Sequence, residues 1–258
     1  MTHEYGKPPI RIFLGDQALF PDDDGDWAPS EPDPSTTLWR YMSFAKFCSM
    51  LEHRSLFFAL VGDMEDQYEG FIYPPAAREP NDPLLQAEQV SQDVLRSISR
   101  SALVSCWTES SYESRLMWTT YASTEGVAIR TTFHDLRESM CSVAELPVTF
   151  GKVKYIDYRQ SEVPRFGWAP LFHKRMEYRS ETEMRAVLPG PRWNAADLPD
   201  VHLDPDVAEL RGRYVPLDLD ILIKQVVVPP DAAPWFAEVV RSAVQRSRVN
   251  VSVTPSVI

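Results

Sequence analysis

Glycine is scarce in this chain, and the motifs that depend on it are missing. Only 10 of the 258 residues are glycine, against 22 prolines. The sequence contains no GxGxxG string of a dinucleotide-binding turn, no P-loop and no GxSxG nucleophile turn. The three enzyme classes that rely on these strings are therefore disfavoured.

Metal-binding and disulfide patterns are missing as well. The three cysteines, Cys48, Cys106 and Cys141, show no CxxC spacing, and the five histidines lie far apart without an HExxH pair. We therefore expect neither a metal site nor a disulfide framework. A reducing cytoplasm fits this composition best.

Long apolar runs do not occur. Segments such as Leu56–Val61 and Ile221–Val228 are far shorter than the roughly 20 residues that a membrane helix needs. The N-terminus also lacks the apolar stretch of a signal peptide. We expect a cytoplasmic protein with no membrane partner.

Acidic residues outnumber basic ones, 37 to 26, so the formal net charge is -11. This charge disfavours broad adhesion to nucleic acid or anionic lipid, and a nucleic-acid substrate would need a local basic cleft. Residues 12–39 contain no basic residue, which is typical of a solvated arm that could also act as a tether or guard a basic site. We divide the chain into an acidic, Pro-rich arm at 1–34 and a single domain at 35–258.

The domain alternates strand-like and helical segments, but without the regular βα repeat of a parallel sheet. Ser43 is expected to cap a helix in which Phe44, Phe47, Cys48 and Leu51 share one face. The pattern therefore predicts an α+β fold, with a mixed, largely antiparallel sheet packed with helices. Strands are predicted at Leu38–Met42, Ser55–Val61, Ala102–Trp107, Gly126–Phe133, Val153–Tyr158, Arg213–Leu217 and Lys224–Val228, and further helices from Asn81 and from Asp231.

The segment Ala102–Phe133 masses aromatic and acidic side chains between two predicted strands. Ser110 or Ser111 is expected to cap a helix that carries Glu113 in its first turn. A carboxylate there suits the positive end of the helix dipole.

On that helix, Met117 and Tyr121 would share one face, with Trp118 beside them. Two interpretations of the segment stay open. It is either an aromatic hinge that packs a helix on the sheet, with Glu113 as a cap, or the wall of a binding pocket.

The segment Tyr178–Leu188 carries the most concentrated charge pattern. As a strand from Glu181, it would project Glu181, Glu183 and Arg185 from one face and its apolar residues from the other. As a helix, it would form only an ordinary i to i+4 ion pair. The following Pro189-Gly190 favours a strand for at least the second half.

This charged row has several possible uses. A solvated strand edge is one. Two close carboxylates can also divide acid and base roles, or stabilise a cationic sugar in a transition state. Together with Lys174 and Arg175, the same row could instead bind an anion.

The ordered set of these features resembles a large, functionally uncharacterised bacterial family, some of whose relatives are abortive-infection proteins of phage resistance. The resemblance covers Leu38 to about Ile258. It rests on Leu38-Trp39-Arg40-Tyr41, Leu56-Phe57-Phe58, Asp66-Gln67-Tyr68-Glu69, Ser105-Cys106-Trp107, Glu113-Ser114, Met117-Trp118, Tyr121, Gly126-Val127-Ala128-Ile129, Tyr155, Lys174, Tyr178 and the row Glu181, Glu183, Arg185.

More distantly, the chain looks like an ADP-ribosyltransferase-like domain, because a first strand with a basic residue and Tyr is followed much later by Glu-x-Glu. The resemblance implies that Arg40 and Tyr41 hold the dinucleotide, that Glu183 is the catalytic carboxylate and that Glu181 assists the acceptor. The chain departs from the family pattern in having Arg40-Tyr41-Met42 in place of His-Tyr-Thr, and no clear Ser-Thr-Ser strand. The hypothesis of such an enzyme also requires a ligand pocket. Its expected members are Arg130 or Arg185 as a further cation, Trp107, Trp118 or Tyr121 as a stacking wall, and Ser105, Glu113 and Lys174 nearby.

The leading hypothesis is an enzyme that uses NAD as substrate and transfers ADP-ribose to a protein, a nucleic acid or water, as an effector in anti-phage defence. The alternative is a non-catalytic sensor or binding subunit that recognises a phage protein, a partner defence protein or a small ligand. A third possibility is a nuclease with Asp66, Glu69, Glu181 and Glu183 around magnesium. For the first hypothesis we expect one common pocket. Its predicted members are Arg40, Tyr41, Trp107, Glu113 and Glu183.

Overall fold

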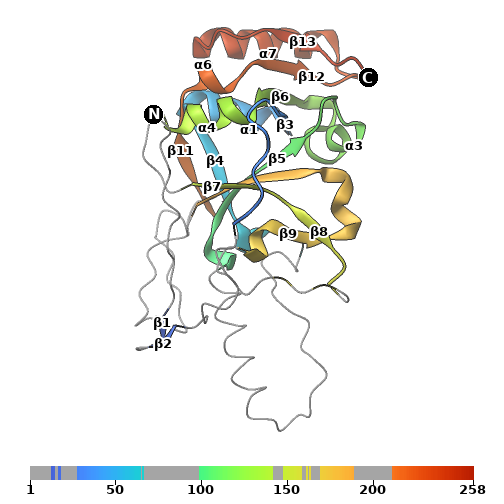
Figure 1. Cartoon of the computed structure of the whole chain (residues 1–258). Coiled ribbons are helices and arrows are strands. Elements are labelled where there is room, and N and C mark those ends of the chain that lie inside the picture. The colour runs from blue at the N-terminus through green and yellow to red at the C-terminus, as the bar shows by residue number, and fades with distance from the viewer. Residues whose placement is uncertain are drawn as a thin grey trace.

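A nine-stranded mixed sheet forms the centre of the molecule (Figure 1). The computed structural model describes residues 13–14, 17–18, 28–64, 66, 99–141, 148–158, 161, 163, 169–188 and 211–258. Most strand pairs are antiparallel and helices pack against the sheet, which confirms the predicted α+β class. The helix predicted from Asn81 lies outside the described residues, as does most of the acidic arm.

Most of the strands follow the sequence prediction, because short apolar segments between polar residues are poor helices and good buried strands. The strands at Thr149–Lys152, His173–Arg175 and Val253–Pro255 were not predicted. The strands are β1 (Phe13–Leu14), β2 (Gln17–Ala18), β3 (Thr37–Ser43), β4 (Ser55–Leu60), β5 (Leu103–Glu109), β6 (Gly126–Thr132), β7 (Thr149–Lys152), β8 (Lys154–Ile156), β9 (His173–Arg175), β10 (Glu183–Leu188), β11 (Gly212–Pro216), β12 (Gln225–Val228) and β13 (Val253–Pro255). The helices are α1 (Phe44–His53), α3 (Arg115–Met117), α4 (Phe133–Cys141), α6 (Leu219–Leu222) and α7 (Pro234–Ser247), with the short turns η2 (Val61–Asp63), η3 (Trp118–Ala122), η4 (Ser123–Glu125), η5 (Ala169–Phe172) and η6 (Met176–Glu181).

The sheet branches at β5. Along its main path the strand order is β11-β4-β5-β3-β6-β12-β13, while β10 pairs with the whole length of β5 and carries β7 on its far side. The other edge of β5 is shared, since β4 pairs with Leu103 and Val104 and β3 pairs with Thr108 and Glu109. β3 and β4 therefore diverge beside the middle of β5.

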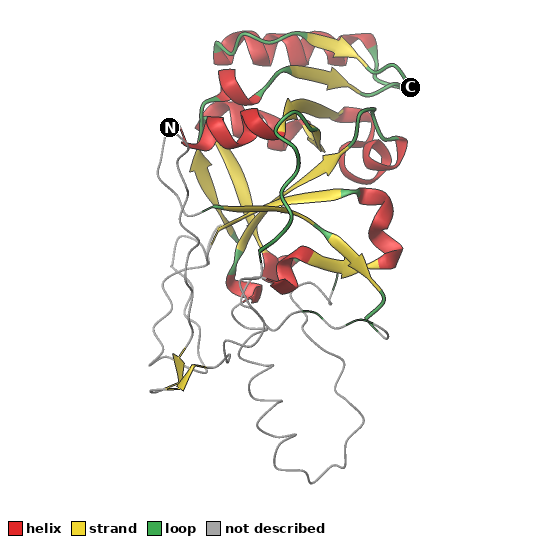
Figure 2. Cartoon of the chain, viewed as in Figure 1, coloured by secondary structure: helices red, strands yellow, loops and turns green. Residues whose placement is uncertain are grey.

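Successive side chains of a strand point to opposite faces, and β3 shows which face is which. Leu38 and Met42 belong to the main core, which α1, α4, α6 and α7 cover. Trp39 and Tyr41 point the other way and pack with residues of η3. In Figure 2 the long helices accordingly gather on one side of the sheet.

The helix α1 begins where the sequence predicts. The side chain of Ser43 accepts a hydrogen bond from the Lys46 amide, and the helix ends at Arg54, whose φ of 44° is left-handed. The buried residues Phe47 and Leu51 lie on its apolar face. Local capping and the periodicity of apolar residues were sufficient to predict the start and the buried face of α1.

The last helix, α7, differs from its prediction. It begins at Pro234, because proline suits the first helical position. The residue before it, Ala233, provides no side-chain cap. Asp231 lies before it and pairs with Arg115 at 3.4 Å instead. The second residue of α7, Trp235, is 55% exposed.

The segment after β5 departs furthest from the prediction. Ser114, and neither Ser110 nor Ser111, caps the short helix α3, and the chain then widens into the π-helix η3. In a π-helix, residues four positions apart in sequence no longer lie on the same face. Met117 is consequently buried while Tyr121 is 47% exposed, so their predicted common face was wrong.

η3 is held tightly against the sheet. A Cβ on Gly126 would lie 2.2 Å from the Ala122 carbonyl oxygen, so only glycine fits there. Ser123, which ends the π-helix, has a φ of 51°, a region that costs free energy for residues other than glycine. Packing therefore imposes this backbone against the local preference.

Residues 28–34 lie against the domain. The Lys152 amide donates to the Ser30 carbonyl at 2.8 Å, the His134 amide donates to Pro34 at 2.9 Å, and Arg137 pairs with Glu31. Pro32 is buried. The boundary at residue 34 stays a prediction, but these contacts show that the last part of the predicted arm is docked.

None of the helices in the described part of the chain combines the length and the apolar character needed to cross a bilayer.

Candidate active site

The charged row of β10 faces away from the main core. Its register with β5 places Glu183 opposite Thr108 and Arg185 opposite Cys106. Met184 points to the other side, into the main core. The predicted separation of charged and apolar faces is therefore confirmed for this strand. The row begins later than predicted, because Glu181 ends the turn η6 and Thr182 is left-handed with a φ of 41°.

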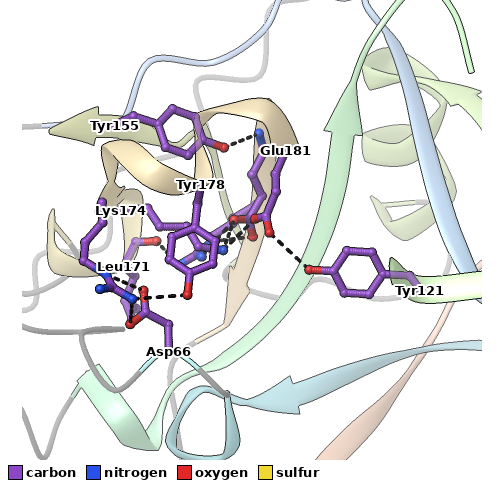
Figure 3. Close-up of polar contacts among 10 residues, drawn as sticks. Asp66, Tyr121, Tyr155, Leu171, Lys174, Tyr178 and Glu181 are labelled. Carbon is purple, nitrogen blue, oxygen red and sulfur yellow. Dashed lines mark hydrogen bonds and ion pairs between the residues drawn. The ribbon is translucent and has the colours of Figure 1, made fainter. Parts of the chain in front are cut away.

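Two carboxylates and two cations form a buried network at the start of β10 (Figure 3). Lys174 donates to Glu181 at 2.7 Å and to Glu183 at 3.3 Å. Arg185 grips both oxygens of Glu183, at 2.8 and 3.0 Å, and donates to the Leu171 carbonyl at 2.7 Å. The network contains equal numbers of positive and negative charges, which reduces the cost of burying each of them.

The two carboxylates differ in access and in electrostatics. Burial alone would raise the pKa of Glu183, but the charges of Arg185 and Lys174 outweigh it and lower that pKa below its ordinary value. The Glu183 side chain is 5% exposed, whereas that of Glu181 is 14% exposed. Glu183 is therefore a fixed, ionised group, and Glu181 is the carboxylate nearer to solvent.

Two tyrosines border the network from different elements. The Tyr121 hydroxyl donates to Glu181 at 3.3 Å, and the Tyr155 hydroxyl accepts from the Glu183 amide at 2.8 Å. Burial, followed by the nearby carboxylates, raises the pKa of the Tyr121 phenol above its ordinary value. Figure 3 shows Tyr121 reaching toward Glu181 from one side, with Tyr155 and Tyr178 on the other.

Arg40 occupies the place where β3 and β4 diverge. Its guanidinium donates to the Ser105 hydroxyl and, at 3.2 Å, to the Phe57 carbonyl, and it lies 5.6 Å from the centre of the Trp107 ring. Burial lowers the pKa of Arg40 to about 10. Among the described residues it pairs with no carboxylate, although a partly buried guanidinium favours one.

Cys106 lies near both Arg40 and the carboxylate network, although it and Ser105, the partner of Arg40, point to opposite faces of β5. Its thiol hydrogen-bonds with Glu183, and its charge, when ionised, would raise the pKa of Arg40. Cys106 is partly exposed. The resemblance was marked by the tripeptide that contains it, yet its role was missed, because its proximity to Glu183 depends on the register of β5 and β10.

The structure brings the residues of the predicted common pocket together only in part. Tyr41 points to the opposite face of β3 from Arg40, where it is buried against Trp118 and accepts the Ser114 amide through its hydroxyl at 2.8 Å. Trp107 lies in the main core and donates to the Ser105 hydroxyl at 3.1 Å. Neither aromatic ring offers a free face to a ligand.

Trp118 and Glu113 also have structural contacts. Trp118 is 3% exposed and donates to Glu113 at 3.0 Å. The same carboxylate accepts from the Ser256 hydroxyl at 2.5 Å and from the Val257 amide at 3.1 Å. Glu113 thus binds the C-terminal segment and does not lie in the first turn of a helix. Of the predicted stacking residues, Tyr121 alone has an exposed ring.

The remaining predicted cations fall into two groups. Arg185 is fully buried and committed to Glu183. Arg130 is exposed and lies 5.8 Å from the centre of the Trp39 ring, on the same face as the network. Arg130 therefore stays a candidate ligand contact, whereas Arg185 supports Glu183.

The described carboxylates of the nuclease hypothesis, which are Asp66, Glu181 and Glu183, form no metal-binding group. Asp66 is bound by Arg175 at 3.0 and 3.4 Å, and Glu69 lies outside the described residues. Within the described ranges, no group of three or more His, Cys, Asp or Glu residues is arranged to hold a metal ion. The sequence alone does not show which basic residue each of these acidic residues contacts.

Comparison with known proteins gives a limited result. No family model matches this chain, and no curated protein matches its sequence. Three similar solved structures are of Thermus sp. 2.9 DarT, in complex with NAD+, with carba-NAD+ and with ADP-ribosylated ssDNA. Their identities are 10%, 12% and 12%, and their TM-scores are 0.40, 0.37 and 0.39. The alignments cover 88%, 87% and 90% of this chain and 97%, 96% and 98% of those chains.

Proposed function

We propose that the protein binds NAD between Arg40 and the carboxylate network and transfers its ADP-ribose to an acceptor. One observation carries the proposal. A partly buried guanidinium without an acidic partner among the described residues lies near Cys106, whose thiol hydrogen-bonds with the ionised carboxylate of Glu183. A ligand with an anionic part and a part that becomes cationic would satisfy both groups.

The anionic part is the diphosphate. Arg40 uses two of its nitrogens on neutral oxygen atoms, and a phosphate oxygen would be a stronger acceptor for the same guanidinium. Because burial already lowers the pKa of Arg40, an arriving anion would be favoured by that unmet charge. Arg130, exposed on the network's face of the sheet, could contact the distal end of the ligand.

The cationic part is the ribose of the transition state. When the bond between C1′ and the nicotinamide nitrogen breaks, its electrons remain with nicotinamide and neutralise that ring. Positive charge then develops on the ribose, where a fixed carboxylate stabilises it. Glu183 is held ionised and oriented by Arg185 and Lys174, so it needs no reorganisation as the charge develops.

The acceptor completes the reaction. Its nucleophilic atom bonds to C1′ and loses a proton, for which the more exposed Glu181 is the suitable base. The half-exposed ring of Tyr121, whose hydroxyl donates to Glu181, would provide a surface for nicotinamide. Whether the acceptor is a protein or a nucleic acid is to be determined by the experiment that follows.

The test measures nicotinamide release from NAD by wild type and by Glu183→Gln, with single-stranded DNA, RNA and the protein itself as acceptors. Gln keeps the size of Glu183 but removes its charge, so turnover should fall by about 100-fold or more. Glu238→Gln, at an exposed position of α7, is the matched control and should retain full turnover. Urea unfolding of each variant separates lost chemistry from lost folding.

A binding module is the second candidate, and one observation favours it. Both oxygens of Glu183 are already engaged by cations, which suits a recognition site as well as a catalytic one. NAD binding without nicotinamide release, measured by calorimetry, would establish this function and overturn the enzymatic one.

The defence role is part of the same proposal and rests on the resemblance of the sequence to abortive-infection proteins. If the chain is an effector, its expression should slow bacterial growth, and Glu183→Gln should relieve the effect. Equal toxicity of wild type and variant would separate the defence role from this site.

A further inference from the structure

We propose that Glu113 is a positioning residue, which sets the place of Tyr121 over Glu181 by tying the C-terminal segment to η3. This inference rests on the proposed function, because it gives the site a structural control. Glu113 accepts three hydrogen bonds, from Trp118 at the start of η3 and from Ser256 and Val257 at the C-terminal end. One carboxylate therefore joins two segments far apart in the sequence.

The C-terminal segment reaches Glu113 along a defined path. β13 pairs in parallel with β12, with Val226 opposite Val253, and the Ser256 amide donates to the Val228 carbonyl at 3.0 Å. β12 in turn pairs with β6, the strand that follows η3 and η4. The C-terminal segment is thereby fixed to the sheet next to Ser256 and Val257, the residues that Glu113 binds.

η3 transmits this position to the site. Its first residue, Trp118, packs edge-on against Tyr41 with ring centres 5.1 Å apart, and its end presses on Gly126. Tyr121 follows Trp118 by three residues and reaches Glu181. A shift of Trp118 would consequently move Tyr121 relative to the carboxylate.

The contact with Glu181 cannot hold Tyr121 by itself. It is a hydrogen bond of 3.3 Å at a ring that is 47% exposed, which is long for an oxygen pair. Glu113, by contrast, accepts three hydrogen bonds, of 3.0, 2.5 and 3.1 Å. The location of Tyr121 therefore depends more on the anchoring of η3 than on its own hydroxyl.

The first experiment needs no enzymatic activity. Tetranitromethane modifies tyrosine phenolates, and Tyr121, whose phenol has a raised pKa, should react slowly in wild type. In Glu113→Gln, which loses the charge and one acceptor oxygen, its nitration rate should rise about tenfold, the factor that corresponds to about 1.4 kcal/mol. Tyr112, which is 80% exposed, serves as the internal control and should react equally in both proteins.

The second experiment uses NAD turnover. Glu113→Gln and Tyr121→Phe should change kcat and KM for NAD in the same direction, and the double variant should show less than the sum of the two single effects. Hydrogen exchange should increase in 115–123 and stay unchanged in α1, which distinguishes local release from general destabilisation.

The outcomes separate the two proposals. If wild type releases no nicotinamide but Tyr121 becomes more reactive in Glu113→Gln, the proposed function fails and the positioning role stands. If the nitration rate of Tyr121 is unchanged, or rises together with exchange in α1, Glu113 does not position Tyr121 and the inference is overturned.

Discussion

Two guanidinium groups of the same sheet have opposite surroundings. Arg185 is fully buried and meets both oxygens of Glu183, with a carbonyl as its third partner. Arg40 is partly buried and meets a hydroxyl, a carbonyl and an aromatic ring. Arg185 therefore has its counterion within the protein, while Arg40 has a place for a counterion from outside. Burial of an arginine alone does not mark a ligand site. Whether the arginine already has a carboxylate partner within the protein is the more informative property.

The largest effect that this comparison predicts is on stability. Replacing Arg185 by Met removes the principal partner of a buried carboxylate, which typically costs about 3 to 5 kcal/mol. The free energy of unfolding from urea titrations should fall by that amount. Arg213→Met, at an exposed position on β11, is the control and should leave it nearly unchanged. Equal stability of both variants would show that the Glu183 network is not a stability element.

The second effect is on ligand affinity. Arg40→Met removes a cation with no acidic partner among the described residues, so the free energy of unfolding should change little. Affinity for ADP, which carries the same diphosphate, should fall by about tenfold to 100-fold, as expected for a charge-assisted contact. Calorimetry with ADP and adenosine checks this, since adenosine binding should be equally weak in wild type and variant. Unchanged ADP affinity would refute the anion site at Arg40.

The smallest effect is in the pH dependence of stability. The pKa of Glu183 in the folded protein lies below its ordinary value of 4.5, so the unfolded chain binds the proton more readily. Glu183 thus contributes stability that is present above about pH 4.5 and is lost as the pH falls through its lower folded pKa. Urea titrations from pH 7 to 3 should show a weaker acid destabilisation for Glu183→Gln. An identical pH profile in the variant would mean that other carboxylates dominate.

Local features were predictable because they depend on residues close in sequence. The cap at Ser43, the strand at β3 and the opposite faces of Glu183 and Met184 all follow from periodicity. The turn around Trp118 was not predictable, since the π-helix is held by contacts of Gly126 with Ala122. Local propensity favours an ordinary helix there.

Long-range pairing explains the errors about the site. The resemblance assigned both Arg40 and Tyr41 to the ligand, yet strand geometry turns them to opposite faces. Glu113 was assigned to a helix cap or pocket, since the sequence does not show that Ser256 and Val257 approach it. Cys106 was missed because only the register of β5 and β10 brings it to Glu183.

The sequence by itself determined most of the strands, which of their faces are apolar and that Glu183 and Arg185 would share one face. These properties depend on side-chain spacing of two or about 3.6 residues, which is written in the order of residues. Only the tertiary structure decided which cation each carboxylate meets. Arg185 and Lys174 lie with Glu183, while the divergence of β3 and β4 leaves Arg40 with neutral partners among the described residues. Charges pair according to their distance in space and their burial, and both are set by strand register and branching of the sheet.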